Sequence, residues 1–172
     1  RIPSCTVTKT VGELLLAKEN RPVFLRIDAR REDTKAANVI SQMEGEGGKR
    51  IVLCAHLDTI FGTRGALDNA SGVAVLLRLA RIFGENNPET ALEFVFFNGE
   101  ECYSAPGEQE YLSSDFFSPE TTALAINIDG VGLRNRNISV SEFGCPDTIL
   151  SAEKEARKNY PAIKEVGPWP AG

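Results

Sequence analysis

The sequence has 172 residues and a formal net charge of −5, which suits one globular domain with a core of its own. It is 42% hydrophobic and 25% charged, a composition that excludes a disordered chain. The basic residues are scattered, so we expect no nucleic-acid partner. No apolar run approaches the roughly 20 residues that cross a bilayer, so we also expect no membrane partner.

The four cysteines are few and widely spaced: Cys5, Cys54, Cys102 and Cys145. They do not suggest a disulfide framework, and since none forms a CxxC pair, a cysteine zinc site is not expected either. This usage leans towards a reducing, cytoplasmic compartment. The sequence opens on Arg1 rather than methionine, so we expect a processed or cut start, and secretion is not excluded.

The first third of the chain contains three predicted strands. The first ~20 residues form a small amphipathic segment with no strand of its own. Strands are predicted over 22–28 (PVFLRID) and 36–45 (AANVISQMEG), with a charged turn between them. Residues 50–56 (RIVLCAH) form a third, apolar run that is rich in β-forming side chains.

A helix is predicted after a loop that contains glycines. From Ala70 to Phe83, apolar residues recur at helical spacing, and Gly84 is the expected C-cap. We expect this helix to be largely buried. The remaining elements are a strand over 91–97, a short helix over 107–114, strands over 121–129 and 136–143, and an amphipathic helix over 146–160.

Strands that alternate with helices predict an α/β fold, a three-layer α/β/α sandwich with a mostly parallel central sheet. Its central strands would be 50–56, 91–97 and 121–127. In such open sheets, ligands bind at the carboxyl ends of the strands. The polar residues at those ends are therefore the candidates for function.

Acids and the sole histidine follow these strands or precede the helix: His56, Asp58, Asp68, Glu100, Glu101 and Asp129. Each also has a simpler interpretation, because His56 can be an ordinary histidine, Asp68 a helix cap and Asp129 a turn residue. Together, one imidazole and several carboxylates suit Zn²⁺ or a similar divalent ion, and a carboxylate-rich set suits two ions with a shared ligand.

The adjacent carboxylates Glu100 and Glu101 need a reason to follow an apolar strand. The simplest is that both point into water at a turn opened by Gly99. Alternatively, their side chains diverge, so that Glu101 binds metal while Glu100 takes a proton from a metal-bound water and delivers it to a leaving amine. Residues i and i+2 of an extended segment share a face, so Asp58 can lie beside His56 and fix its tautomer.

Four motifs resemble the M28 family of zinc aminopeptidases. They are HLD, LDNASGVAVLL, NGEE and NIDGVG, and the resemblance covers roughly residues 36 to 132. It implies a zinc peptidase with two co-catalytic ions on an α/β/α sandwich, which acts on peptides with a free N-terminus. It also implies a cis peptide bond between Asp68 and Asn69.

The resemblance also implies a role for each candidate residue. His56 and Asp129 would bind one zinc ion, and Asp68 would bridge both ions. Glu101 would bind the second ion, Glu100 would be the general base, and Asp58 would support His56.

The sequence departs from the family pattern because it has no second histidine as a zinc ligand, and because the family domain normally continues beyond this point. We therefore expect a domain that lacks its C-terminal part. Residues 1–22 would be an N-terminal remnant or linker, and residues 23–172 the peptidase domain. We expect two zinc ions in the complete site, one or none in this chain, and the activity of the chain alone stays open.

Three alternatives have distinct signatures. M20-type carboxypeptidases and deacylases share HxD and paired glutamates, but usually carry a lysine after the bridging aspartate, where this sequence has DNASG. A glutaminyl cyclase of the same fold would be an acyltransferase with one zinc ion. A module without metal is the third alternative, and metal analysis separates it from the enzymes.

Overall fold

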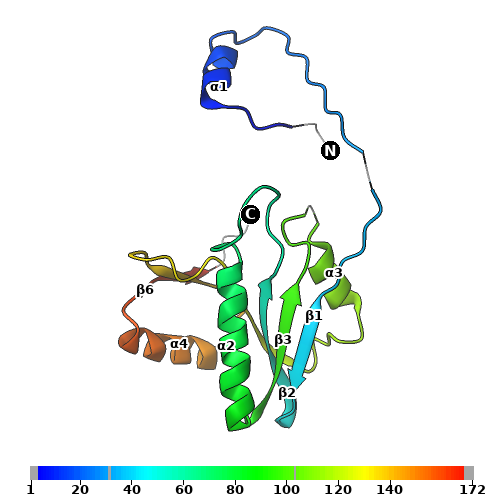
Figure 1. Ribbon diagram of the computed structural model, residues 1–172. Coiled ribbons are helices and arrows are strands. Elements are labelled where there is room, and N and C mark those ends of the chain that lie inside the picture. Colours follow the sequence, from blue (N-terminus) through cyan, green and yellow to red (C-terminus); the bar gives the residue numbers. More distant parts are fainter. Residues whose placement is uncertain (1–3, 31, 103, 169–172) are drawn as a thin grey trace. The chain divides into compact units, whose positions relative to one another are not determined.

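The structure is a computed structural model that describes residues 4–30, 32–102 and 104–168 (Figure 1). By its internal contacts, the chain divides into two compact units, residues 1–35 and 36–172. No helix in the described ranges is both long and apolar enough to cross a membrane. The assignment of 1–22 and 23–172 to a linker and a peptidase domain stays a prediction.

The described residues of the first unit contain one helix, α1 (Lys9–Leu16), whose N-cap residue Thr8 accepts a hydrogen bond from the backbone N–H of Val11. The prediction of a strand over 22–28 is wrong, since these residues form no regular structure and their apolar side chains are exposed. A strand requires a neighbour for its backbone hydrogen bonds. The described part of this unit contains no other strand to provide one.

The second unit is built on a four-stranded sheet with the order β1-β3-β2-β4. β1 (Val39–Met43) is antiparallel to β3 (Thr90–Phe97), and β2 (Glu46–His56) is parallel to both β3 and β4 (Thr122–Asn127). The mostly parallel sheet is therefore confirmed. Of the three strands predicted to be central, β2 and β3 are, whereas β4 lies at the edge of the described sheet and its side chains are mostly exposed.

Alternate side chains of β2 and β3 point to opposite faces of the sheet, as the period of a strand requires. On one face the core contains Leu53, Ala55, Leu92, Phe94 and Phe96, together with Leu76 of helix α2 (Ala70–Asn86). On the other face it contains Val52, Cys54, Val95 and Phe97, together with Tyr111 of helix α3 (Pro106–Ser113). Helices on both faces confirm the three layers of the predicted fold.

Helix α2 (Ala70–Asn86) confirms the helical spacing but differs from the prediction in two ways. Only Gly72 and Leu76 are fully buried, so the helix packs along one stripe and is not largely buried. It continues past Gly84 to Asn86, so the prediction of Gly84 as the C-cap is wrong. The C-cap residue is Asn87, which has a left-handed φ of 44°, a conformation that asparagine tolerates.

Four further elements belong to the described part of the second unit. Helix α3 (Pro106–Ser113) begins with a proline, which suits the first helical position. The predicted strand over 136–143 is β5 (Ile138–Glu142), and the predicted final helix is α4 (Asp147–Asn159). Strand β6 (Ile163–Pro168) was not predicted, and it pairs with β5 in a separate parallel sheet of two strands.

Candidate metal centre

His56 ends β2 and is almost completely buried, with 2% of its surface exposed. Its Nδ1 lies 3.0 Å from the backbone oxygen of Asp58, which assigns the proton to Nδ1 and leaves a lone pair on Nε2. Nε2 is buried and has no hydrogen-bond partner among the residues that the structure describes. A buried nitrogen in this state is suited to bind a cation.

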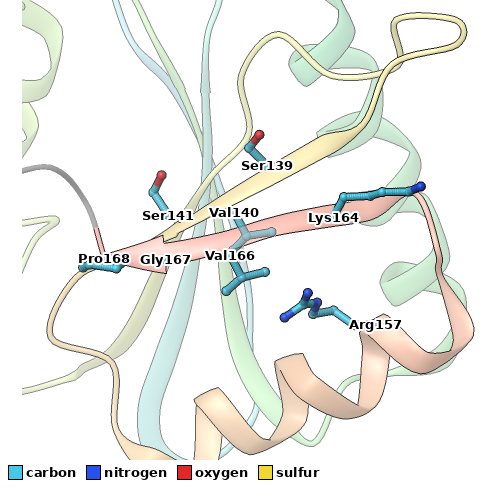
Figure 2. A pocket seen from close by; sticks show the side chains of 8 residues that line it. All are labelled: Ser139, Val140, Ser141, Arg157, Lys164, Val166, Gly167 and Pro168. Carbon is cyan, nitrogen blue, oxygen red and sulfur yellow. The ribbon is translucent and has the colours of Figure 1, made fainter.

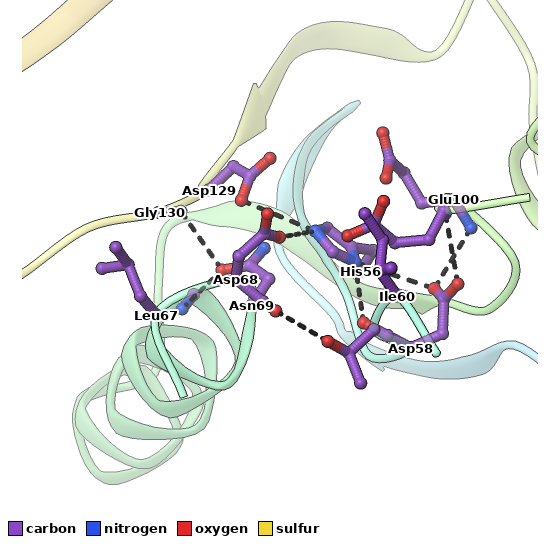
Figure 3. Close-up of polar contacts among 12 residues, drawn as sticks. His56, Asp58, Ile60, Leu67, Asp68, Asn69, Glu100, Asp129 and Gly130 are labelled. Carbon is purple, nitrogen blue, oxygen red and sulfur yellow. Dashed lines mark hydrogen bonds and ion pairs between the residues drawn. The ribbon is translucent and has the colours of Figure 1, made fainter. Parts of the chain in front are cut away.

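Two carboxylates face Nε2 (Figure 3). The Oδ1 atom of Asp68 lies 2.9 Å from it, and the Oδ1 atom of Asp129 lies 3.5 Å from it. Ligand atoms from these three residues all lie within 4.8 Å of one another. Three elements thus contribute to one point, namely the end of β2, the residue that precedes the α2 cap and the residues after β4.

The pKa of His56 shows how strongly acidic this point is. Burial alone would lower the pKa, but Asp129, Glu100, the hydrogen bond to Asp58 and Asp68 together raise it above its ordinary value. The local potential is therefore negative. Without a cation, the acids here repel one another, and a bound cation would relieve that repulsion.

Asp68 is not the helix cap that its position allowed. The cap of α2 is Asn69, whose Oδ1 accepts a hydrogen bond from the N–H of Gly72 at 2.9 Å. Asn69 also donates from Nδ2 to the backbone oxygen of Ile128 at 2.9 Å, and the Asp68–Asn69 peptide bond is cis, as the resemblance implied. The capping interpretation of Asp68 is therefore wrong. Sequence reasoning missed Asn69, although its place before the helical run is typical of a cap.

Asp58 lies beside His56, as expected, but its side chain also contacts the turn that carries the two glutamates. Its carboxylate accepts hydrogen bonds from the backbone N–H groups of Glu100 and Glu101, at 3.1 and 3.2 Å. The Oδ1 atom of Asp58 lies 3.7 Å from Nδ1 of His56, whereas the backbone oxygen of Asp58 lies 3.0 Å from the same nitrogen. The backbone of Asp58 orients the imidazole, and its side chain holds the turn that carries the two glutamates.

The two glutamates lie on a tight turn at Gly99, which has a φ of +85°. Burial raises the pKa of Glu100, as do the nearby Glu108, Asp129 and Asp58, against the opposing effect of His56. Loss of hydration also raises the pKa of Glu101, and its strongest charged neighbour is Asp68. Sequence reasoning missed Glu108, because nothing in its local pattern places it beside the turn.

Glu101 lies beside the cluster of three ligand residues and is not a member of it. It lines, together with Asp68, a cavity of about 230 Å³ whose other walls come from the loop after β2. The expected convergence therefore holds for His56, Asp68 and Asp129. Asp68 and Glu101 still face the same cavity, which is what a second ion shared between them would need.

A larger hollow of about 390 Å³ lies away from these acids (Figure 2). It is formed by β5 and β6, with Arg157 and Lys164 at its side. None of the candidate residues lines it. The chemistry indicated by the acids therefore belongs to the smaller cavity beside Asp68.

Comparisons with known proteins give the family of the chain. The model of peptidase family M28 matches residues 38–166. A probable lipoprotein aminopeptidase, LpqL, from Mycobacterium tuberculosis is 35% identical over 133 residues, which cover 75% of this chain and 26% of that protein. A probable zinc metalloprotease from Pyrenophora tritici-repentis is 43% identical over 68 residues, 40% of this chain and 15% of that protein.

Among solved structures, the glutaminyl cyclase of Bacteroides thetaiotaomicron bound to N-acetylhistamine is similar, with a TM-score of 0.62 and 25% identity. The similarity covers 76% of this chain and 55% of that chain. Fold and site thus define an α/β protein with a candidate divalent-metal centre at the carboxyl ends of its parallel strands. The chain belongs to peptidase family M28.

Proposed function

We propose that this chain carries the zinc ligands and the proton-transfer group of an aminopeptidase. The observation that carries the proposal is Nε2 of His56, which is buried, makes no hydrogen bond within the described ranges and faces carboxylate oxygens of Asp68 and Asp129. One imidazole with carboxylates is a ligand set that suits zinc. Family membership and the likeness to a probable zinc metalloprotease support the same metal.

The residues present fit the metal. His56, Asp68 and Asp129 would hold one ion, and Asp68 and Glu101 would contribute to a second. Zinc bound at this point would supply a Lewis acid for the peptide carbonyl and would lower the pKa of water. The sole histidine of the sequence is used by the first ion, so a second ion would draw only carboxylates from this chain.

Glu100 would move the proton. Its backbone N–H is held by Asp58, so its carboxylate extends from a fixed turn. In the proposed reaction, it accepts a proton from the attacking water and donates it to the leaving nitrogen of the peptide. The raised pKa of Glu100, due first to burial and then to neighbouring acids, brings it closer to neutral pH, where both transfers are favourable.

The likeness to a probable lipoprotein aminopeptidase supports an enzyme that acts at the N-terminal end of its substrates.

A second candidate is glutaminyl cyclisation, which the similar cyclase structure favours. The two reactions differ in product, since one releases a free amino acid and the other closes the N-terminal glutamine into a ring. A carboxypeptidase or deacylase of the M20 type would act at a different end or bond. A comparison of leucyl 4-nitroanilide, a peptide with N-terminal glutamine and an N-acylated amino acid separates the three.

The test uses the full-length protein, because this chain spans 26% of the mycobacterial relative. We expect bound zinc and release of nitroaniline, loss of both after treatment with a chelator, and recovery on addition of zinc. Cyclisation without hydrolysis would replace the proposal with the second candidate. Absence of bound zinc in protein purified with and without added zinc would contradict both.

A further inference from the structure

We propose that Asn137 is an acceptor for an N-linked glycan and that Asn69 is not. The acceptor signature is Asn-Xaa-Ser or Asn-Xaa-Thr, with any residue except proline in the middle. The sequence contains this signature twice, as NAS at 69–71 and as NIS at 137–139. A glycan is bulky and hydrophilic and has to lie at the surface of a folded protein, so the surroundings of each asparagine decide between them.

Asn137 follows an exposed turn. Residues 132–137 are all exposed. The N–H of Arg136 donates to the backbone oxygen of Leu133 at 3.3 Å, and Asn135 has a φ of +60°. A positive φ at the third residue of such a turn suits asparagine. A glycan on Asn137 would therefore extend into solvent from a defined turn.

The serine of the same signature is also at the surface. Ser139 belongs to β5 and is exposed. In Figure 2, its side chain lies on the opposite side of β5 from Arg157 of α4. The strand begins one residue after Asn137, where the N–H of Ile138 donates to the backbone oxygen of Ala162 at 2.8 Å. The signature at 137–139 thus joins an exposed turn to the exposed beginning of a strand.

Asn69 has the opposite surroundings. It is 1% exposed, and its Nδ2, the atom to which a glycan is attached, donates to the backbone oxygen of Ile128 at 2.9 Å. Its Oδ1 accepts a hydrogen bond from the N–H of Gly72 at 2.9 Å. A Cβ at Gly72 would lie only 2.5 Å from that oxygen. A sugar therefore has no room beside Asn69 in the folded protein.

The reaction requires a transferase and an oligosaccharide that is attached to a lipid pyrophosphate. Nδ2 of Asn137 forms a bond to C1 of the first sugar, and the bond between C1 and the pyrophosphate oxygen breaks. The lipid pyrophosphate leaves, and a base of the transferase takes one proton from Nδ2. Such transferases modify chains that enter an export compartment, so the test directs the protein there.

The test expresses the full-length protein with a secretion signal in a eukaryotic host and isolates the folded, secreted fraction. Peptide N-glycosidase in heavy-oxygen water converts each glycosylated asparagine into labelled aspartate, and mass spectrometry of tryptic peptides measures Asn137 and Asn69 separately. We expect label at Asn137 and none at Asn69. Transfer can precede folding, but a chain modified at Asn69 cannot bury that side chain and is therefore absent from the folded fraction.

Four variants connect the glycan with the signature. Asn137→Gln removes the acceptor and Ser139→Ala removes the hydroxyl, so we expect each to lose the glycan at position 137 completely. Ser139→Thr keeps the hydroxyl and should keep the glycan. Arg134→Gln is the matched control, because Arg134 is exposed in the same turn and lies outside the signature. We expect its label at Asn137 to equal that of the wild type.

Three results would overturn the inference. Absence of label at Asn137 would show that this turn is not an acceptor, and Asn137 is measured in the cell-associated fraction as well, so the result does not depend on the yield of secretion. Label at Asn69 in the folded fraction would show that burial does not decide between the two asparagines. Equal loss of label in Arg134→Gln and Ser139→Ala would show that the signature is not what the transferase recognises.

Discussion

At the scale of single residues, Glu100 and Glu101 are neighbours in sequence with different surroundings. Both donate a backbone N–H to the carboxylate of Asp58, but of the two only Glu101 lines the cavity beside Asp68. We assign proton transfer to Glu100 and metal binding to Glu101. Substitution by glutamine keeps the shape of each side chain and removes its charge, so the two variants should fail in different ways.

For Glu100→Gln in the full-length protein, we expect zinc content near that of the wild type and a kcat lower by roughly 10²–10⁴-fold, the usual scale of a lost general base. For Glu101→Gln, we expect zinc to be lost first and activity to recover in part in excess zinc. Zinc stoichiometry and peptidase kinetics measure both. Equal zinc loss in the two variants, or full activity of Glu100→Gln, would mean that the assignment is reversed or wrong.

Asp58→Asn separates two interpretations of Asp58. His56 is oriented by the backbone oxygen of residue 58, which the substitution keeps, whereas one of the two N–H groups of the glutamate turn would lose its acceptor. We therefore expect kcat to fall about 10–100-fold, the scale of a lost supporting contact, with zinc affinity nearly unchanged. A variant that loses zinc with normal kcat in excess zinc would instead show that the carboxylate supports His56.

At the scale of elements, a buried charge links β1, β2, β3 and α3. Glu93 of β3 is fully buried and accepts hydrogen bonds from Gln42 at 2.5 Å and from the hydroxyl of Tyr111, and it lies 3.3 Å from a guanidinium nitrogen of Arg50. Burial, followed by the bond to Glu93, raises the pKa of Tyr111, so this hydroxyl stays a donor. The network replaces apolar packing at the centre of one face of the sheet.

Glu93→Ala leaves Arg50 mostly buried without its counter-charge. Removal of one partner of a buried pair costs about 3–5 kcal/mol, so we expect a loss of this size in the free energy of unfolding, measured by urea denaturation of this chain. The matched control is Glu85→Ala, which removes the partner of Arg81 from an exposed helical pair and should cost far less. Equal losses would mean that the Glu93 network does not stabilise the sheet.

Cys54 reports on the same layer of the fold. Burial, with a contribution from Glu108, raises its pKa to about 12, so at pH 8 the thiol is protonated as well as covered. We expect iodoacetamide to modify the exposed Cys5 and Cys102 in the native protein and to reach Cys54 only after unfolding. Peptide mapping by mass spectrometry measures this. Native modification of Cys54 at the rate of Cys5 would contradict the packing of β2.

The elements that could be predicted are those whose signal is local. The runs that form β2 and β3 and the helical spacing of α2 are such signals, and the acids could be placed because parallel strands end at one edge. The strand that lies beside another in the sheet cannot be predicted from such local signals. The apolar run over 22–28 has no strand beside it in its described unit, and β4 is as apolar as a central strand but lies at an edge.

In the site, too, contacts that follow from the strand order could be predicted, and contacts between distant side chains could not. His56, Asp68 and Asp129 converge because the topology brings their elements together. The contact of Asp58 with the glutamate turn joins residues that lie 42 and 43 positions apart in the sequence. Spacing within HLD contains no information about that distant partner, so the sequence favoured the imidazole.

At the scale of the whole molecule, the family, the fold and the cluster of acids all support the proposal that this chain binds zinc through His56. The mostly parallel sheet places the histidine at the end of β2, and the peptidase family supplies the class of chemistry. Peptide substrates and the identity of the general base both depend on that claim. Its test should therefore observe the metal itself.

The most direct measurement is anomalous X-ray diffraction at the zinc absorption edge from crystals of the protein grown with zinc. We expect an anomalous peak about 2.0–2.2 Å from Nε2 of His56 and from carboxylate oxygens of Asp68 and Asp129, the usual bond lengths of zinc. Crystals of His56→Ala should lose that peak. A map without a peak at this point, or with zinc bound only elsewhere, would contradict zinc binding through His56.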